Sequence, residues 1–200
     1  TNSNTQNSLN VIDADGDDYF EITSYSTLSS GNLQAFIVCK VTTANKTADS
    51  ILSMDNNDAG VVDWQINAAN ANQFRGALSV SNQTNANTGS GQNAGLTGFR
   101  IFCADIDFTD DQQYSLIIDG ELKLGNNARP YTVQIGSDQE FRVFANRSNT
   151  QFPIGQIAEV ILLDNTNDGI REKVEGYLAH KWGIESLLSA SHPYKSSPPS

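Results

Sequence analysis

The stretch that decides the fold is Gly155-Gln-Ile-Ala-Glu-Val-Ile-Leu-Leu-Asp164 followed, after a short polar break, by Ile170-Arg-Glu-Lys-Val-Glu-Gly-Tyr-Leu-Ala-His-Lys-Trp-Gly183. The first part is rich in β-branched and apolar residues, as is typical of a buried strand, whereas the second has the apolar periodicity of a helix. The residues before this stretch have the patterns of strands and loops. We therefore predict an all-β domain that ends in one α-helix.

The helix is predicted over about residues 168–182. Counting about 100° per residue from Ile170 gives an apolar stripe about 140° wide, which we expect to be buried. The residues of this stripe are Val174, Tyr177, Leu178, Lys181 and Trp182. Asn167 or Asp168 can cap the N-terminus, and Gly183 suits the position just beyond the C-terminus.

Gly176 is unusual because a glycine inside a helix costs about 1 kcal/mol relative to alanine. It shares the face opposite the apolar stripe with Ala179. Either it is an exposed and tolerated residue, or it marks the close approach of a loop, another domain or another chain. The sequence leaves both alternatives open.

The rest of the chain contains short apolar and β-branched runs separated by clusters of Asn, Gly, Ser and Asp, a pattern that predicts antiparallel strands. The expected strands lie near residues 9–13, 18–23, 33–43, 48–54, 61–67, 73–80, 99–107, 113–119, 121–124, 131–135, 140–145 and 154–163. Asp119-Gly120 is the clearest hairpin turn. The longest irregular stretch, Ser81–Gly98, is either a surface loop or a binding loop whose amides and hydroxyls contact a ligand.

The C-terminal segment resembles the ending of laminin-G-like, concanavalin A-like domains of bacterial surface proteins and phage structural proteins. The matching parts are the strand Ile157–Ile161, the helix Glu175–Gly183, the tail His192–Lys195 and, upstream, the turn and strand Asp15–Ile22 and the hairpin Leu116–Leu122. The resemblance implies an antiparallel two-sheet jelly-roll sandwich. It implies no single activity, because this fold hosts lectins, adhesion modules, lyases and glucanases.

Length and charge limit the classes of protein to consider. The chain of 200 residues suits one domain, and we expect a linker remnant at 1–8, a single laminin-G-like sandwich at 9–195 and a C-terminal tail at 196–200. A start at Thr1 suggests a mature or excised domain of a larger extracellular protein, located outside the cell, on its surface or on a virion. The net charge of −11 argues against nucleic-acid partners. Membrane insertion is not expected, because no stretch approaches the roughly 20 apolar residues of a span.

Two cysteines, Cys39 and Cys103, lie within predicted strands. They are either buried thiols that act as small apolar residues or one disulfide between neighbouring strands. The distance between them would decide, and the sequence does not provide it.

Two carboxylates are candidates for catalysis. Asp105 and Asp107 would share one face of a strand, as the paired carboxylates of glycosidases do. No Glu stands nearby to act as the acid, so a polysaccharide-cleaving enzyme is the least favoured function. Both histidines, His180 and His192, belong to the helix and tail, where a packing role is expected.

Calcium is a candidate ligand of the turn that gathers four carboxylates within six residues. These are Asp13, Asp15, Asp17 and Asp18. Calcium requires six to eight oxygen ligands and such a turn can supply several, although aspartates also close turns without a metal. A second match, Asp164–Gly169 with Glu175, has the spacing of a calcium loop, but Glu175 belongs to the predicted helix and the helix is favoured.

Sugar binding needs an aromatic ring for stacking and polar groups for the hydroxyls. The candidate ligand-binding residues are Trp64, Asn67, Arg75, Arg100 and Tyr131, with Phe74 beside them. The alternative is that Trp64 belongs to the core.

We therefore expect a non-catalytic carbohydrate-binding or adhesion module, with calcium as a candidate cofactor and a glycan or cell-surface polymer as its partner. The second candidate is a structural or assembly domain of a phage or surface protein. Such a domain would contact neighbouring domains of a larger chain or form a homo-oligomer.

Overall fold

The computed structural model describes residues 4–25, 32–43, 49–55, 62–70, 73–80, 92–93, 98–107, 113–124, 139–146, 152–164 and 167–200. The first strands in this part of the chain are β1 (Thr5–Gln6), β2 (Leu9–Asn10), β3 (Ile12–Ala14), β4 (Phe20–Tyr25), β5 (Asn32–Thr43), β6 (Asp49–Asp55) and β7 (Val62–Asn70). They are followed by β8 (Gln73–Val80), β9 (Gln92–Asn93), β10 (Arg100–Asp107), β11 (Gln113–Ile118), β12 (Glu121–Leu124), β13 (Gln139–Val143) and β14 (Ile154–Leu163). One α-helix, α1 (Asp168–Trp182), and a short 3-10 helix (Glu185–Leu187) complete the described elements.

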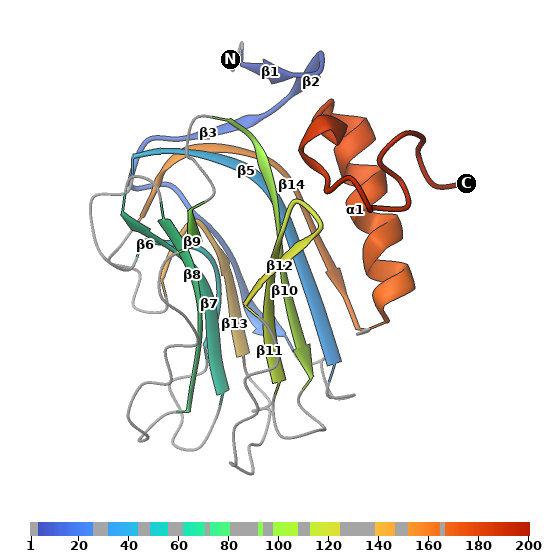
Figure 1. The fold of residues 1–200 in the computed structure, drawn as a ribbon. Helices are drawn as coiled ribbons and strands as arrows, with labels where there is room; N and C mark the ends of the chain where they lie inside the picture. Colours follow the sequence, from blue (N-terminus) through green and yellow to red (C-terminus); the bar gives the residue numbers. More distant parts are fainter. Residues whose placement is uncertain are drawn as a thin grey trace.

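Two six-stranded sheets make up the body of the molecule. Their strand orders are β12-β11-β10-β5-β14-β3 and β4-β13-β6-β7-β8-β9. All pairs within them are antiparallel. The sheets face each other as two layers (Figure 1). This arrangement confirms the predicted antiparallel sandwich with one C-terminal helix.

The first sheet is apolar on both faces because it has a neighbour on each side. Along β10, Phe102 and Ile106 belong to the cluster between the sheets, whereas Ile101 and Cys103 belong to the cluster beneath α1. The alternation follows from the two-residue period of a strand. Figure 1 shows α1 outside the sandwich, next to β5 and β14.

Strand alternation also explains the cysteines. Cys39 packs in the cluster between the sheets, whereas Cys103 packs in the cluster beneath α1. Both are buried free thiols. The alternative of two buried thiols is therefore confirmed, and the two side chains belong to different faces of the same sheet. Burial raises the pKa of both thiols, because it disfavours the thiolate.

The helix begins and ends where the sequence predicts. Asn167 is the N-cap, and its side chain accepts a hydrogen bond from the Ile170 amide. Gly183 has φ +66° and ends the helix in the left-handed conformation, donating to the carbonyls of Ala179 and His180. Both ends are local motifs that satisfy backbone groups without a helical partner. No helix in the described part of the chain is long and apolar enough to cross a membrane.

The buried face of α1 is only partly the predicted stripe. Leu178 and Trp182 are buried as expected, but Tyr177 is 42% exposed. Gly176 and Ala179, on the face predicted to be open, are buried instead. The prediction assumed one covering layer, whereas α1 has two: the sheet on one side and the C-terminal tail on the other.

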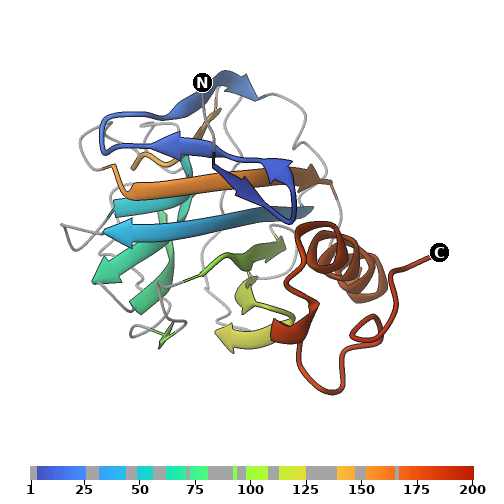
Figure 2. The ribbon, with the colours of Figure 1, turned by 90° about the horizontal axis from the view of Figure 1, so that it is seen from above.

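The tail explains Gly176. A Cβ atom at this position would overlap the Cβ of Tyr194. His180 Nε2 lies 2.9 Å from the Tyr194 carbonyl oxygen and holds the tail in place. Close approach is therefore the correct alternative for Gly176, and the approaching segment is the end of the same chain. Figure 2 shows this segment folded along the helix.

Residues 4–10, which overlap the predicted linker remnant at 1–8, form a short ribbon that contacts the body of the molecule. In this ribbon Thr5–Gln6 pairs with Leu9–Asn10. The Gln6 and Asn7 side-chain amides donate to the carbonyls of Trp182 and Lys181 at 2.8 and 2.9 Å. They satisfy carbonyls that the end of a helix leaves without partners. Figure 2 shows this ribbon beside α1.

Several strand bounds also differ from the prediction. The expected strand near 9–13 is divided between β2 and β3, and the two-residue strands β1 and β9 were not predicted. The expected strand at 131–135 and most of the Ser81–Gly98 loop lie outside the described residues.

Candidate functional site

The predicted sugar-binding residues whose side chains the structure describes, Trp64, Asn67 and Arg100, do not form one site. Trp64 lies in β7, is 0% exposed and packs against Phe141 in the core between the sheets. A ring without exposed surface cannot stack on a sugar, so the core alternative describes Trp64. Asn67 is also buried and accepts a hydrogen bond from Ser50 at 2.6 Å. Phe74 is buried in the same core.

The other predicted residues lie elsewhere. Arg100 belongs to β10 in the opposite sheet and pairs with Asp119 at 2.7 Å. Arg75 lies opposite Asn67 in the neighbouring strand, and its side chain is outside the described part of the structure. Tyr131 is outside the described residues. Sequence spacing could not have grouped these side chains, because strand pairing decides which faces they occupy.

The acidic turn is formed in part. The carboxylate oxygens of Asp15, Asp17 and Asp18 lie within 4.8 Å of one another, and all three residues are exposed. Asp13 does not join them. Its carboxylate accepts hydrogen bonds from Gln156 at 2.9 Å and Asn4 at 2.8 Å, which lower its pKa. Three carboxylates could hold a hard cation only if water or other oxygens completed its coordination.

A different group of polar residues lies between α1 and the outer face of the first sheet. Asp105 is in β10, and its direct partners across the two neighbouring strands are Gln34 and Ser115. Gln34 donates from Nε2 to Asp105 at 3.3 Å. Burial raises the pKa of Asp105 to about 6, since it disfavours the charged carboxylate.

Asp105 and Ser115 line a cavity with a volume of about 320 Å³. We call it the helix–sheet pocket. Its lining residues are Asp105, Ser115, Ile117, Gly120, Leu122, Asp168 and Arg171. Its apolar part includes Leu122, which is 60% exposed. The pocket therefore combines hydrogen-bonding groups with an apolar wall, as small-molecule sites do.

Arg171 forms the side of the pocket that belongs to the helix. Its Nη1 donates to both oxygens of Glu175, at 2.8 and 2.9 Å, and its Nε and Nη2 donate to Asp168 at 3.3 Å. Burial opposes the charge of Arg171, but the neighbouring carboxylates of Glu175 and Asp168 raise its pKa overall. The guanidinium is therefore held by protein carboxylates rather than presented to a ligand.

Glu175 connects the pocket to the tail. Its side chain is 1% exposed and lies 3.1 Å from His192 Nε2. Gly120, in the turn between β11 and β12, is close to the same imidazole, since a Cβ there would lie 2.7 Å from His192 Cδ2. Figure 2 shows β12 beside the C-terminal segment. As predicted, both histidines have a packing role, and Glu175 is used by the helix rather than by a calcium loop.

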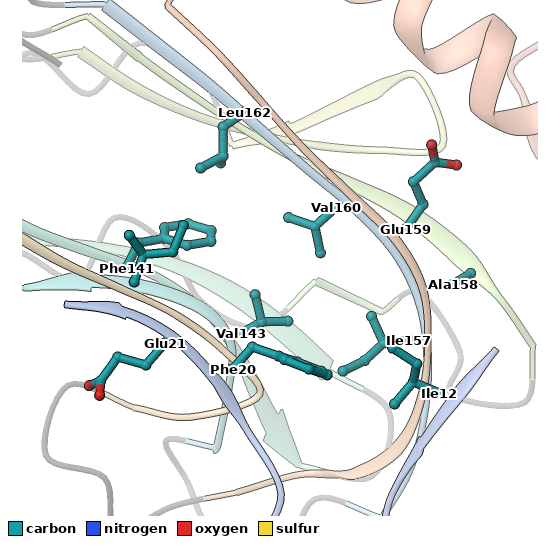
Figure 3. Close-up of a pocket in the computed structure, with 11 residues that line it drawn as sticks. Ile12, Phe20, Glu21, Phe141, Val143, Ile157, Ala158, Glu159, Val160 and Leu162 are labelled. Carbon is teal, nitrogen blue, oxygen red and sulfur yellow. The ribbon is translucent and has the colours of Figure 1, made fainter. Parts of the chain in front are cut away.

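An apolar groove lies at the opposite edge of the sandwich, between β3 and β14 of one sheet and β4 and β13 of the other. Its volume is about 400 Å³. Figure 3 shows Phe20 and Val143 facing Ile157 and Val160 across it. Ile12, Phe20 and Ile22 are each about half exposed, at 47, 50 and 46%. The groove offers apolar surface but little polar chemistry.

Comparisons with known proteins bear on the fold. No family model matches this sequence, and no curated protein matches it. Solved structures do match, at low identity. A heptameric SAP-like pentraxin from Limulus polyphemus aligns with a TM-score of 0.55 and 11% identity over 74% of this chain and 70% of its own. Our protein therefore has a jelly-roll fold.

Two further matches carry sugars in their structures. The CBM40 of the Ruminococcus gnavus IT-sialidase, bound to α2,3-sialyllactose, aligns with a TM-score of 0.54 and 14% identity over 80% of this chain and 95% of its own. Trypanosoma rangeli sialidase in complex with sialic acid aligns with a TM-score of 0.61 and 13% identity over 86% of this chain, which spans only 28% of that enzyme. At these identities the likeness establishes the fold alone.

The helix–sheet pocket was not predicted as a site. The sequence did single out Asp105, but as one of a catalytic pair with Asp107, and Asp107 does not line the pocket. One further signal was present: Arg171 and Glu175 stand four residues apart on the helix, the spacing of an ion pair. Neither signal predicts that β10 lies beside α1.

Proposed function

We propose that this chain is a non-catalytic carbohydrate-binding module of a larger extracellular or virion protein, and that the helix–sheet pocket holds the sugar. The observation that carries the proposal is the position of Asp105, a partly buried carboxylate beside Ser115 in a pocket with an exposed apolar wall at Leu122. Sugar hydroxyls donate to carboxylates, and the C–H face of a sugar ring packs on apolar side chains.

The fold supports the proposal. Similar structures include the sialyllactose-bound CBM40, whose name denotes a carbohydrate-binding module. The resemblance of the C-terminal segment to laminin-G-like domains of surface and phage proteins points in the same direction. Both are likenesses of fold and motif, and neither locates a sugar site in this chain.

A binding role fits the pocket better than catalysis does. Glycoside hydrolysis normally requires two carboxylates that flank the bond to be broken. Glu175, behind the pocket, is buried and is held by Arg171 and by His192. The second lining carboxylate, Asp168, is 82% exposed at the pocket mouth and bonds to Arg171. The pocket therefore has one partly buried carboxylate, Asp105, rather than two that would flank a bond inside it.

Calcium would act away from the sugar. The acidic turn follows β3, which is the last strand at one edge of the first sheet, whereas the pocket lies over β10, β11 and β12 at the other edge. We expect calcium bound to Asp15, Asp17 and Asp18 to stabilise the turn without contacting the sugar.

A glycan array, read with and without calcium, tests the proposal. Binding of at least one glycan class, weakened by Asp105→Asn and unchanged by Asp107→Asn, is the expected result. Asp107 is a matched control, because it lies two residues along on the same strand face and does not line the pocket. No binding under either condition, or binding that Asp105→Asn leaves unchanged, would reject a sugar site in this pocket.

A structural or assembly role is the second candidate, and the apolar groove is the observation that favours it. Apolar residues exposed together often mark contacts between proteins. If the groove joins two copies of this chain, light scattering at high concentration should detect a dimer that Phe20→Glu abolishes. A monomer at every concentration would count against self-assembly.

A further inference from the structure

The charge of the helix–sheet pocket indicates which sugars it accepts. Two carboxylates line it, those of Asp105 and Asp168, and a third, Glu175, lies directly behind Arg171. Arg171 is the single basic residue among the lining residues. Each of its three guanidinium nitrogens already donates to Glu175 or Asp168. The pocket is therefore an acceptor site with an excess of negative charge.

A buried amide next to Asp105 adds an acceptor to this part of the molecule. Gln34 is 0% exposed, and its Oε1 has no hydrogen-bond partner among the described residues. The Nε2 atom of the same amide donates to Asp105. A buried acceptor without a partner is unfavourable, because it has lost its hydrogen bonds to water. Gln34 lies behind the pocket wall and does not line the pocket itself.

A metal ion is a poorer match for the pocket than an organic donor. Among the described residues, Asp15, Asp17 and Asp18 alone bring three possible ligand atoms within 4.8 Å of one another. The pocket carboxylates do not gather in this way. The pocket volume of about 320 Å³ also suits a sugar unit rather than a bare ion.

We propose that the helix–sheet pocket selects a hexosamine unit with a free, protonated amino group over N-acetylated and acidic sugars. The inference rests on the proposed carbohydrate-binding function. An ammonium group supplies three N–H donors and a positive charge, which the Asp105 and Asp168 carboxylates can accept. Acetylation removes the charge and adds bulk, and an acidic sugar would place a carboxylate beside two others.

The ionisation of Asp105 is compatible with this role. Its pKa is raised to about 6 by burial, so the side chain is mostly ionised near neutral pH. A cation beside it would stabilise the charged form further. Asp168, with a side chain 82% exposed, lies at the pocket mouth and supplies a second negative charge.

Isothermal titration of three ligands at about pH 7 tests the inference: a glucosamine tetramer, the matching N-acetylglucosamine tetramer and 3′-sialyllactose. We expect the glucosamine tetramer to bind about tenfold more tightly than its acetylated form, as one charge-assisted hydrogen bond can achieve. Sialyllactose should bind most weakly. Asp105→Asn should remove most of the preference for the amine, whereas Asp107→Asn should preserve it.

Asp168→Asn is a second variant, chosen because an exposed side chain can be changed with little risk to folding. It should reduce the preference for the amine by a smaller factor than Asp105→Asn does. Equal affinity for the two tetramers, or tighter binding of sialyllactose, would overturn the inference and leave the carbohydrate-binding function standing. If none of the three ligands binds and the glycan array is also negative, the proposed function itself falls.

Discussion

Tyr194 packs directly on the bare backbone of Gly176, so closely that a methyl group at 176 would overlap the Tyr194 Cβ. The tail therefore covers the face of α1 that carries Gly176. His192, two residues before Tyr194, reaches Glu175 on the same helix. The helix, the tail and the wall of the pocket form one packed unit.

Gly176→Ala should destabilise the protein even though alanine is the better helix former by about 1 kcal/mol. The added methyl group would displace Tyr194, and overpacking of this kind costs about 1–3 kcal/mol. Urea unfolding measures the change, with the exposed helix residue Lys173→Ala as the control, which should be nearly neutral. A stabilised Gly176→Ala variant would show that the tail does not hold this position.

Glu175→Gln should destabilise the protein by about 3 kcal/mol, because it leaves the Arg171 guanidinium without its buried partner. The pair is well shielded, with side-chain exposures of 14% for Arg171 and 1% for Glu175. Chemical denaturation of the single variants and of Arg171→Met/Glu175→Gln checks the coupling. The double variant should recover part of the loss, and strictly additive effects would contradict a coupled pair.

Asp105 should make stability fall as pH rises through about 6. Its pKa in the folded protein is about 6, above the ordinary value of 3.8, so the folded state binds this proton more tightly than the unfolded state. The ionised Asp105 carboxylate destabilises the folded state fully above the folded pKa of about 6. This destabilisation disappears as the pH falls towards the ordinary value of 3.8. Asp105→Asn should therefore be more stable than the parent protein near neutral pH, with the difference shrinking as pH falls from about 6 to about 4. Denaturant titrations across this pH range measure the difference in the free energy of unfolding. A difference that does not change with pH would contradict the raised pKa of Asp105.

Calcium should raise the melting temperature if the acidic turn binds it, because a ligand specific for the folded state stabilises that state. Asp17→Asn removes one of the three clustered carboxylates and should weaken the effect. Differential scanning calorimetry with calcium, and with magnesium as the comparison ion, measures it. The same shift in the variant as in the parent would place the ion elsewhere. No shift in either protein would indicate that the turn closes without a metal.

How much of the site was predictable varies from residue to residue. Asp105 and Asp107 were correctly placed on one strand face, because a strand has a fixed two-residue period. Arg171 and Glu175 could have been paired from their helical spacing alone. Trp64 could not be assigned, because its strand alternation leaves open which face is buried. Arg100 was grouped with Trp64 by residue type, but strand order places them in opposite sheets.

By itself, the sequence determined the elements whose causes are local. The ends of α1 follow from Asn167 and Gly183, which satisfy backbone groups within a few residues of themselves. The strands follow from short apolar runs, and the sandwich follows from their number and the single terminal helix. Only the tertiary structure decided which segments pack against each other. It places the tail on Gly176, and it aligns Gln34, Asp105 and Ser115 across three neighbouring strands. The physical reason is that strand register and layer packing are set by contacts between residues far apart in the chain, and these contacts leave no local pattern in the sequence.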